Sequence, residues 1–143
     1  MDKVFIRTAT LSDAPSVAHL VSQLGYQTTA PQMESRLQAM LARPEYVLFL
    51  AETNHTVIGL VGAYLTLGLE LDGPYGRLGG LVVDQDWRGH GIGKRLLGAV
   101  EGWLKGRGAS LLLITSGLGR AEAHRFYRHL GYEETGLRFA KKI

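Results

Sequence analysis

The spacing of apolar residues along the chain changes repeatedly between the helical and the strand period. Residues 4–7 form a short apolar start that reads as a strand. Apolar positions then recur every three or four residues from Ala14 to Leu24 and again from Pro31 towards Pro44, which predicts two helices. Residues 46–52 and 56–67 are rich in β-branched and apolar side chains and flank three polar residues, so they are predicted to form a β-hairpin.

The second half of the chain alternates strand and helix. Residues 78–83 predict a strand, 92–104 a helix with one apolar stripe, and 110–115 a strand apolar enough to be buried on both faces. A last helix is predicted over residues 120–130 and a closing strand over 132–142. This order is typical of an α/β fold with a mixed central sheet of about six to seven strands flanked by about four helices.

Composition favours a single folded domain over residues 1–143. The sequence is 45% hydrophobic and 20% charged, which supplies a core and leaves too little charge for a disordered chain. No linker or internal repeat divides it. No apolar run approaches the ~20 residues of a membrane span, and no secretory signal pattern opens the chain, so a soluble cytoplasmic protein without membrane association is expected.

Charge and glycine content point towards an anionic ligand. The formal net charge is +3, and the 19 glycines are roughly twice the usual ~7% share. Nucleic acid is not the expected partner, because the basic residues are interspersed with acidic ones and no recognition motif is present. A metal is not expected either, since the chain has no Cys and its five His residues lack carboxylates at ligand spacing.

The most informative stretch is a strand that leads through closely spaced glycines into a helix, with the sequence LVVDQDWRGHGIGKR over residues 81–95. The first amides of a helix have no internal acceptor and carry about half a positive charge, so they form an anion site. Gly89, Gly91 and Gly93 remove side chains that would keep a phosphate from those amides. Lys94 adds positive charge beside them.

The spacing in this loop excludes two common phosphate motifs. A P-loop needs a glycine where Arg88 stands and a hydroxyl where Arg95 stands, and a dinucleotide fingerprint that starts at Gly89 needs a glycine at Lys94. A tight turn without a ligand is the structural alternative.

Two motifs together carry a resemblance to a known family. The loop reads Arg88-x-x-Gly91-x-Gly93, and a predicted helix with the sequence AHRFYRHLGY follows over residues 123–132. In both motifs, and in the order of its elements, the chain resembles the GNAT family of N-acetyltransferases. The resemblance implies a GNAT-type single domain and an acyltransferase that moves the acetyl group of acetyl-CoA to a primary amine, by direct attack in a ternary complex.

The resemblance also implies which residues hold acetyl-CoA. The backbone of residues 81–83 would pair with the pantetheine arm, the loop amides would wrap the pyrophosphate, and a residue at the start of the last helix would contact the cofactor. Gly79-Gly80 suggests a bulge in the same strand, because glycine inside a strand often marks one. The implied cofactor-binding residues are Leu81, Val82, Val83, Arg88, Gly89, His90, Gly91, Ile92, Gly93, Lys94 and Arg120.

Tyr127 has two interpretations. By resemblance it is the general acid that protonates the leaving thiolate, a role that suits a phenol with a pKa near ~10. By periodicity alone it is a core aromatic, since it shares helical spacing with Ala123, Phe126 and Leu130.

The general base is less defined. Many family members carry a carboxylate on the strand before the bulge, but Gly79 and Gly80 occupy those positions here. Glu70 and Asp72, in the acidic loop before that strand, are the proposed substitutes, and water without a dedicated side chain is the alternative.

The acceptor is expected to be a small-molecule amine bound by loops. The resemblance places it near Tyr26, Tyr75 and Glu133, whose aromatic and acidic groups suit a cation. A protein amine is an alternative acceptor, and a non-catalytic module that senses acetyl-CoA is an alternative function. The oligomeric state stays open, with a homodimer as one option.

Overall fold

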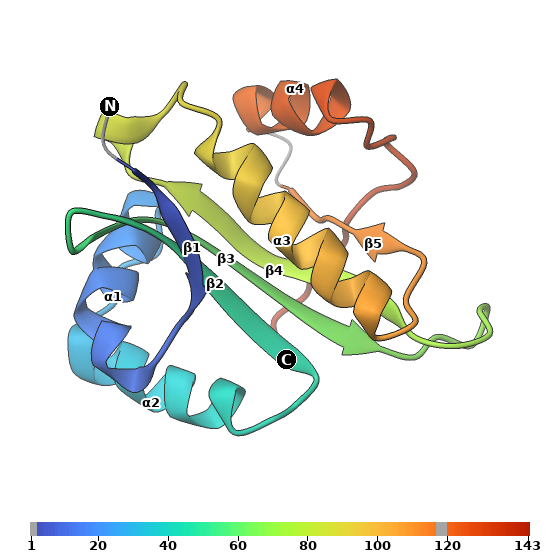
Figure 1. The fold of residues 1–143 in the computed structure, drawn as a ribbon. Helices are drawn as coiled ribbons and strands as arrows, with labels where there is room; N and C mark the ends of the chain where they lie inside the picture. The colour runs from blue at the N-terminus through green and yellow to red at the C-terminus, as the bar shows by residue number, and fades with distance from the viewer. Residues whose placement is uncertain (1–2, 117–119) are drawn as a thin grey trace. The chain divides into compact units, whose positions relative to one another are not determined.

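The computed structural model describes residues 3–116 and 120–143 (Figure 1). By its internal contacts the chain divides into two compact units, one up to Leu113 and one from Ile114 onward. Each unit is described here by itself. None of the helices that the described residues form is long and apolar enough to cross a membrane.

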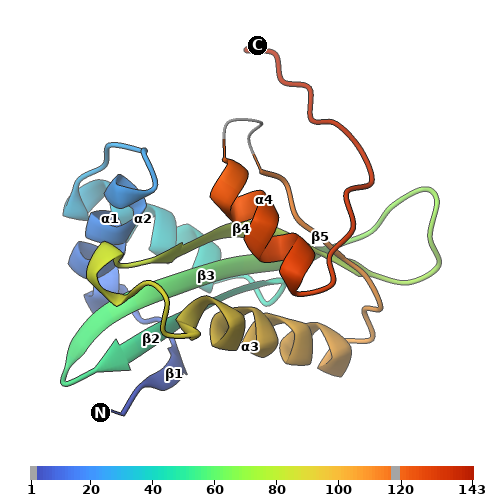
Figure 2. The same cartoon turned by 90° about the horizontal axis from the view of Figure 1, so that it is seen from above.

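The first unit is a mixed sheet with helices on both faces. The sheet order is β1-β2-β3-β4-β5, and all pairs are antiparallel except β4 with β5. In this unit α1 and α2 cover one face and α3 covers the other (Figure 2). The elements are β1 (Phe5–Thr8), η1 (Leu11–Asp13), α1 (Ala14–Gln23), α2 (Ala30–Leu41), β2 (Tyr46–Thr53), β3 (Thr56–Thr66), β4 (Tyr75–Val83), η2 (Gln85–Trp87), α3 (Ile92–Gly106) and β5 (Leu112–Leu113).

The α/β class and the mixed sheet are confirmed, but the predicted number of strands is wrong. The described residues form five strands, not six to seven. The expected closing strand over residues 132–142 is absent from the described chain, where every side chain from Glu133 onward is exposed. The strand expected over residues 110–115 shortens to β5 and is not buried on both faces, since Leu111 is 41% exposed. An apolar sequence favours a strand, but a strand forms only where an adjacent strand supplies main-chain hydrogen bonds.

A bulge interrupts the pairing of β3 with β4, as the glycine pair predicts. Gly62 pairs with Gly80, whereas the next residue of β3, Ala63, pairs with Leu78. Gly79 is therefore the extra residue, and the bulge changes which side of the strand each later residue of β4 presents.

The helix α3 approaches the sheet closely at Gly76. An added Cβ there would lie 2.5 Å from Leu104 Cδ1, and Leu104 is only 4% exposed. Gly76 also pairs with Leu112 of β5. The start of β4 therefore lies directly under α3 and beside β5.

A partly buried ion pair ties the start of α1 to the sheet. The guanidinium of Arg7 on β1 donates to both carboxylate oxygens of Asp13, at 2.9 and 2.8 Å, and to Glu52 Oε1 on β2 at 3.1 Å. Asp13 Oδ2 also accepts from the amide of Thr10 at 2.8 Å. These hydrogen bonds, with that of Arg7 first, lower the pKa of Asp13 from 3.8 to about 2.

The second unit contains one helix among its described residues, α4 (Ala121–His129). Tyr127 packs edge-on against Phe126 and Tyr132, with ring centroids 5.5 and 6.1 Å apart. The amide of Tyr132 donates to the carbonyl of Tyr127 at 3.0 Å, which closes the end of the helix.

Candidate active site

Within the described residues of the first unit, one edge of β4 has no strand paired with it over most of its length, and this is its uncovered edge. Along its other edge it pairs with β3 throughout. On the uncovered side β5 pairs only with Gly76 and Arg77. Among residues 3–116 and 120–143, no strand pairs with this edge along residues 78–83. An extended ligand could therefore add to the sheet here by main-chain hydrogen bonds.

Two amides of β4 face this uncovered edge. The amide nitrogen of Asp84 donates to the carbonyl oxygen of Ile58 on β3 at 2.7 Å. Alternate residues of a strand direct their main-chain groups to opposite sides, so the amides of Leu81 and Val83 point away from β3. The side chain of Val82, which lies between them, is buried in the core beneath α1 and α2.

The turn after β4 is fixed by a side chain from the end of α1. Gln23 Nε2 donates to Asp84 Oδ2 at 3.2 Å, and Gln23 Oε1 accepts from the amide of Gln85 at 3.2 Å. Asp84 Oδ1 accepts from the amide of Asp86 at 2.9 Å and so caps η2. The sequence analysis missed both residues. Asp84 carries a recognisable capping signal before the turn, whereas Gln23 acts from 61 residues away and leaves no local pattern.

The loop from η2 to α3 uses glycine for its backbone conformation. Gly89 and Gly91 have φ values of +83° and +76°, in the left-handed region that side chains disfavour. A Cβ added at either position meets no other atom within 4 Å, so crowding by the protein is not the reason for glycine. Gly91 stands directly before the first turn of α3.

The first turn of α3 offers amides without helical acceptors. These belong to Ile92, Gly93 and Lys94. Ile92 is 3% exposed and anchors this turn in the core under α3, while Lys94 is exposed. Unsatisfied amides, a helix dipole and a basic side chain together fit an anionic group such as a diphosphate.

Three side chains, of Trp87, Arg88 and His90, shape the loop before α3. Arg88 folds back, and its Nε donates to the carbonyl of Val83 at 3.2 Å. The rings of Trp87 and His90 lie 5.9 Å apart. The loop thus closes against the end of β4, which leaves the carbonyl of Val83 already bonded and the amides of Leu81 and Val83 as the main-chain donors at the edge.

The second unit carries Tyr127 on α4 and Arg120 just before that helix. Tyr127 is half-buried, and burial raises the pKa of its phenol, an effect that the charge of Arg120 opposes. A raised pKa keeps the hydroxyl protonated at neutral pH, which a proton donor requires. Arg120 precedes the first residue of the helix.

The residues predicted for the base and the acceptor come from several separate parts of the chain. Glu70 and Asp72 are exposed in the β3–β4 connection, and Tyr26 is 59% exposed between α1 and α2. Tyr75 opens β4 and is 7% exposed, so its ring is mostly a packing surface. Glu133 is exposed after α4. Within the described parts of the chain, no hydrogen bond or ion pair joins any two of these side chains.

The part of the chain that the structure describes brings together no group of three or more His, Cys, Asp or Glu side chains able to hold a metal ion.

Comparison with known proteins decides the family. The sequence profile of the Acetyltransferase (GNAT) family matches residues 14–132. The chain belongs to the GNAT family. It is thus an N-acetyltransferase, and acetyl-CoA is the acyl donor that the family uses.

Two relatives of this GNAT protein are named as acetyltransferases of amines. It is 31% identical to an aminoalkylphosphonate N-acetyltransferase from Salmonella typhimurium, over 96% of this chain and 90% of the relative. It is 34% identical to an aminoglycoside N(6')-acetyltransferase type 1 from Stenotrophomonas maltophilia, over 91% of this chain and 86% of the relative.

Solved GNAT structures share its fold. A GNAT family acetyltransferase from Staphylococcus aureus superposes with a TM-score of 0.84 at 26% identity, over the whole of both chains. An aminoglycoside N-acetyltransferase, AAC(6')-Iy, solved in complex with CoA, superposes with a TM-score of 0.88 at 21% identity, over 99% of this chain and 96% of that one.

Proposed function

We propose that acetyl-CoA binds along the uncovered edge of β4, with its pyrophosphate on the loop before α3. The observation that carries this proposal is the continuity of the two features: the edge with the free amides of Leu81 and Val83 runs directly into the left-handed glycines and the start of α3. The residues that hold the cofactor are those of the predicted set, from Leu81 to Val83 and from Arg88 to Lys94, with Arg120 as a further contact.

The proposed acceptor is a primary amine on a small molecule. Both relatives described above are named for small-molecule amines, an aminoalkylphosphonate and an aminoglycoside, and this supports the class of acceptor. The exposed side chains of Tyr26, Glu70 and Glu133, together with the ring of Tyr75, are the proposed acceptor contacts.

The chemistry needs three groups from the protein. Bound acetyl-CoA supplies a thioester, whose carbonyl carbon the amine attacks and whose sulfur leaves. An amide of the strand from Leu81 to Val83 donates to the carbonyl oxygen as charge develops there. Tyr127 donates a proton to the departing sulfur, and Glu70, Asp72 or water accepts the proton of the amine.

This mechanism takes residues from both compact units, since β4 belongs to the first and Tyr127 to the second. We therefore also propose that residues 1–143 act as a single catalytic domain.

Thermal unfolding with and without acetyl-CoA tests the proposal without knowledge of the acceptor. A ligand at about 100 times its dissociation constant adds ~2.7 kcal/mol, which raises the midpoint of a domain of this size by several degrees. Dephospho-CoA, which retains the pyrophosphate, is the control for the adenosine phosphate. A midpoint unchanged at millimolar acetyl-CoA contradicts the assignment of the loop and of β4.

A further inference from the structure

One part of the sheet face on the α1/α2 side carries a row of aromatic and basic side chains. Tyr46 on β2 pairs with Tyr64 on β3, and Tyr64 pairs with Arg77 on β4. Directly opposed residues share a face, so the three side chains form one row across the sheet. Tyr46 is two residues before Leu48 and therefore shares its face, and Leu48 packs beneath α1 and α2, so the row lies on their side of the sheet.

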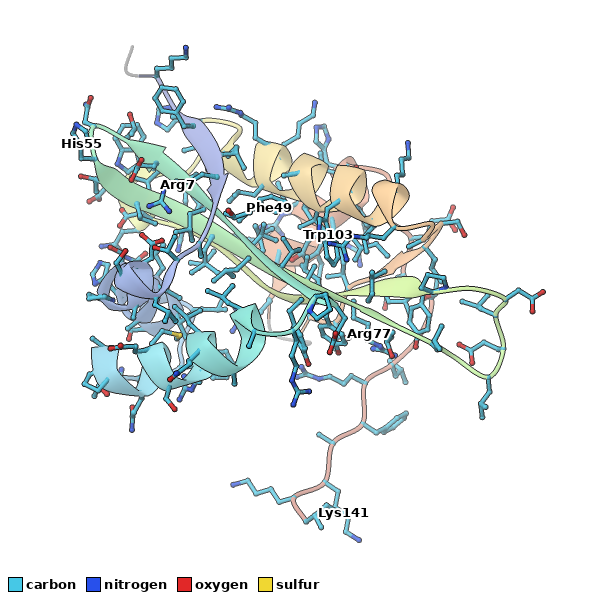
Figure 3. All side chains as sticks on the ribbon, turned by 60° about the horizontal axis from the view of Figure 1, so that its bottom comes forward. Arg7, Phe49, His55, Arg77, Trp103 and Lys141 are labelled. Carbon is cyan, nitrogen blue, oxygen red and sulfur yellow. The ribbon has the colours of Figure 1, made fainter. Side chains whose placement is uncertain are left out.

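The row lies outside the core that α1 and α2 cover. None of its three side chains belongs to the buried cluster beneath these helices, and all three are half-buried. Figure 3 shows Arg77 at the end of the sheet near the β3–β4 loop, beyond the end of α2. The rings of Tyr46 and Tyr64 lie 5.4 Å apart, tilted by 35°, and form an aromatic wall on the two strands that precede Arg77 in the row.

Arg77 is a half-buried cation that forms no ion pair with any described carboxylate. Its guanidinium stands 5.7 Å from the centre of the Tyr75 ring. Among the described residues, the ion pairs involve Arg7 and Arg128, and no carboxylate pairs with Arg77. Charged groups withdrawn from water are ordinarily paired, and the planar fork of arginine matches an oxyanion with two parallel hydrogen bonds.

Arg77 is also close to the bulge in β4, which lies between it and the amides of Leu81 and Val83 that are proposed to hold acetyl-CoA. It is the last residue of β4 that pairs with β5, and the bulge at Gly79 follows two residues later. Two residues of strand span ~7 Å. An acceptor held by Arg77 could therefore present a second group at the bulge if only a short spacer joins the two.

A carboxylate on the neighbouring loop completes the charge pattern. A Cβ added at Gly68 would lie 2.7 Å from Glu70 Oε1 and 3.0 Å from Tyr75 Cε1, so both groups border the same position. Glu70 and the edge of the Tyr75 ring thus both lie next to Gly68, and Arg77 lies 5.7 Å from the centre of the same ring. A carboxylate and a guanidinium near one ring complement a molecule that carries both charges.

We propose that Arg77, with the Tyr46–Tyr64 wall, binds an oxyanion group of the acceptor. The substrate class is then a short amine that also bears a phosphonate, phosphate or carboxylate. This inference rests on the proposed function, because it places the acceptor next to the acyl site of the same strand.

The test compares acceptors that differ only in the anion. Wild-type protein is assayed with acetyl-CoA and 3-aminopropylphosphonate, 4-aminobutyrate or butylamine, which has no anionic group, and kcat/KM is measured for each. The expected preference for an anionic amine over butylamine is about 10- to 100-fold, the worth of a charge-assisted hydrogen bond. The phosphonate and carboxylate arms tell which oxyanion the site favours.

Arg77→Gln should remove that preference and leave kcat/KM for butylamine and the affinity for acetyl-CoA unchanged. Arg77→Lys keeps the charge but loses the planar guanidinium. Its preference for an anionic amine should lie between that of wild type and that of Arg77→Gln. Arg36→Gln, at an exposed arginine of α2, is the matched control and should behave as wild type.

A binding measurement keeps the inference testable apart from turnover. Propylphosphonate, which has the anion but no amine, should bind wild type by calorimetry and lose about 10-fold or more in affinity with Arg77→Gln. An equal loss of kcat/KM for all amines, no preference in wild type, or propylphosphonate binding unchanged in Arg77→Gln overturns the inference. Absent acetyl-CoA binding instead overturns the proposed function.

Discussion

The ion pair between Arg7 and Asp13 allows a stability effect to be calculated from the structure. Asp13→Asn keeps the size of the side chain and removes the charge that Arg7 and the amide of Thr10 stabilise. Glu34→Gln is the control, because Glu34 is an exposed carboxylate on α2 that makes no ion pair in the described part of the chain.

The magnitude follows from the pKa of Asp13. A decrease from 3.8 to about 2 on folding corresponds to about 2.4 kcal/mol of stability. The side chain of Arg7 is 34% exposed, so solvent screens part of this, and we expect Asp13→Asn to cost about 1–2 kcal/mol at pH 7.

The sign of the pH dependence is fixed as well. Folding lowers the pKa of Asp13, so its ionised carboxylate stabilises the folded state fully above about pH 5. This stabilisation falls to roughly half near pH 3 and vanishes below the folded pKa. Urea unfolding of wild type and variant at pH 7, 5, 4 and 3 measures the difference in free energy of unfolding. A wild-type advantage that is absent at pH 7, or constant down to pH 3, refutes the reasoning.

Three further predictions concern glycines and the acid. Gly76→Ala should lower the free energy of unfolding by about 1–3 kcal/mol in a urea titration, because its Cβ would overlap Leu104, whereas Gly102→Ala on the exposed side of α3 should be neutral or stabilising. Gly91→Asp should bind acetyl-CoA at least about 10-fold more weakly by calorimetry than Gly91→Asn, which tolerates the same left-handed backbone without the charge; equal affinities contradict the pyrophosphate site. Tyr127→Phe should lower kcat by about 100-fold at unchanged acetyl-CoA affinity. Because burial raises the pKa of Tyr127, the phenol should stay protonated, and wild-type kcat should not fall through its loss, up to about pH 10. Unchanged kcat would return Tyr127 to a packing role.

The hairpin and the bulge were predictable because their signals are local. The β-branched and apolar runs on either side of Asn54 and His55 define β2 and β3 almost to the residue, and both turn residues adopt the positive φ that a tight hairpin needs. The pair Gly79-Gly80 marked the bulge for the same reason, since glycine inside a strand has few other uses.

The closing strand could not be predicted correctly from residues 132–142. Their aromatic and apolar residues suit a strand, but a strand exists only where a neighbour supplies hydrogen bonds, and no local pattern states whether it does. The same limit applies to residues 110–115, of which only Leu112 and Leu113 form a ladder with β4.

The site residues that the sequence analysis missed depend on distant contacts. Gln23 holds the turn after β4 from the end of α1, and Arg77 joins Tyr46 and Tyr64 only through the register of three strands. Register is set by the whole sheet, so it cannot be read from any one strand.

Hydrogen exchange at single amides tests the central claim most directly. The account predicts that acetyl-CoA slows the exchange of the amides of Leu81 and Val83, together with those of residues 92–94, while amides on the paired edge of β4 change little. Protection that is confined to other parts of the chain, with Leu81 and Val83 unchanged at saturating acetyl-CoA, would contradict the placement of the cofactor on β4.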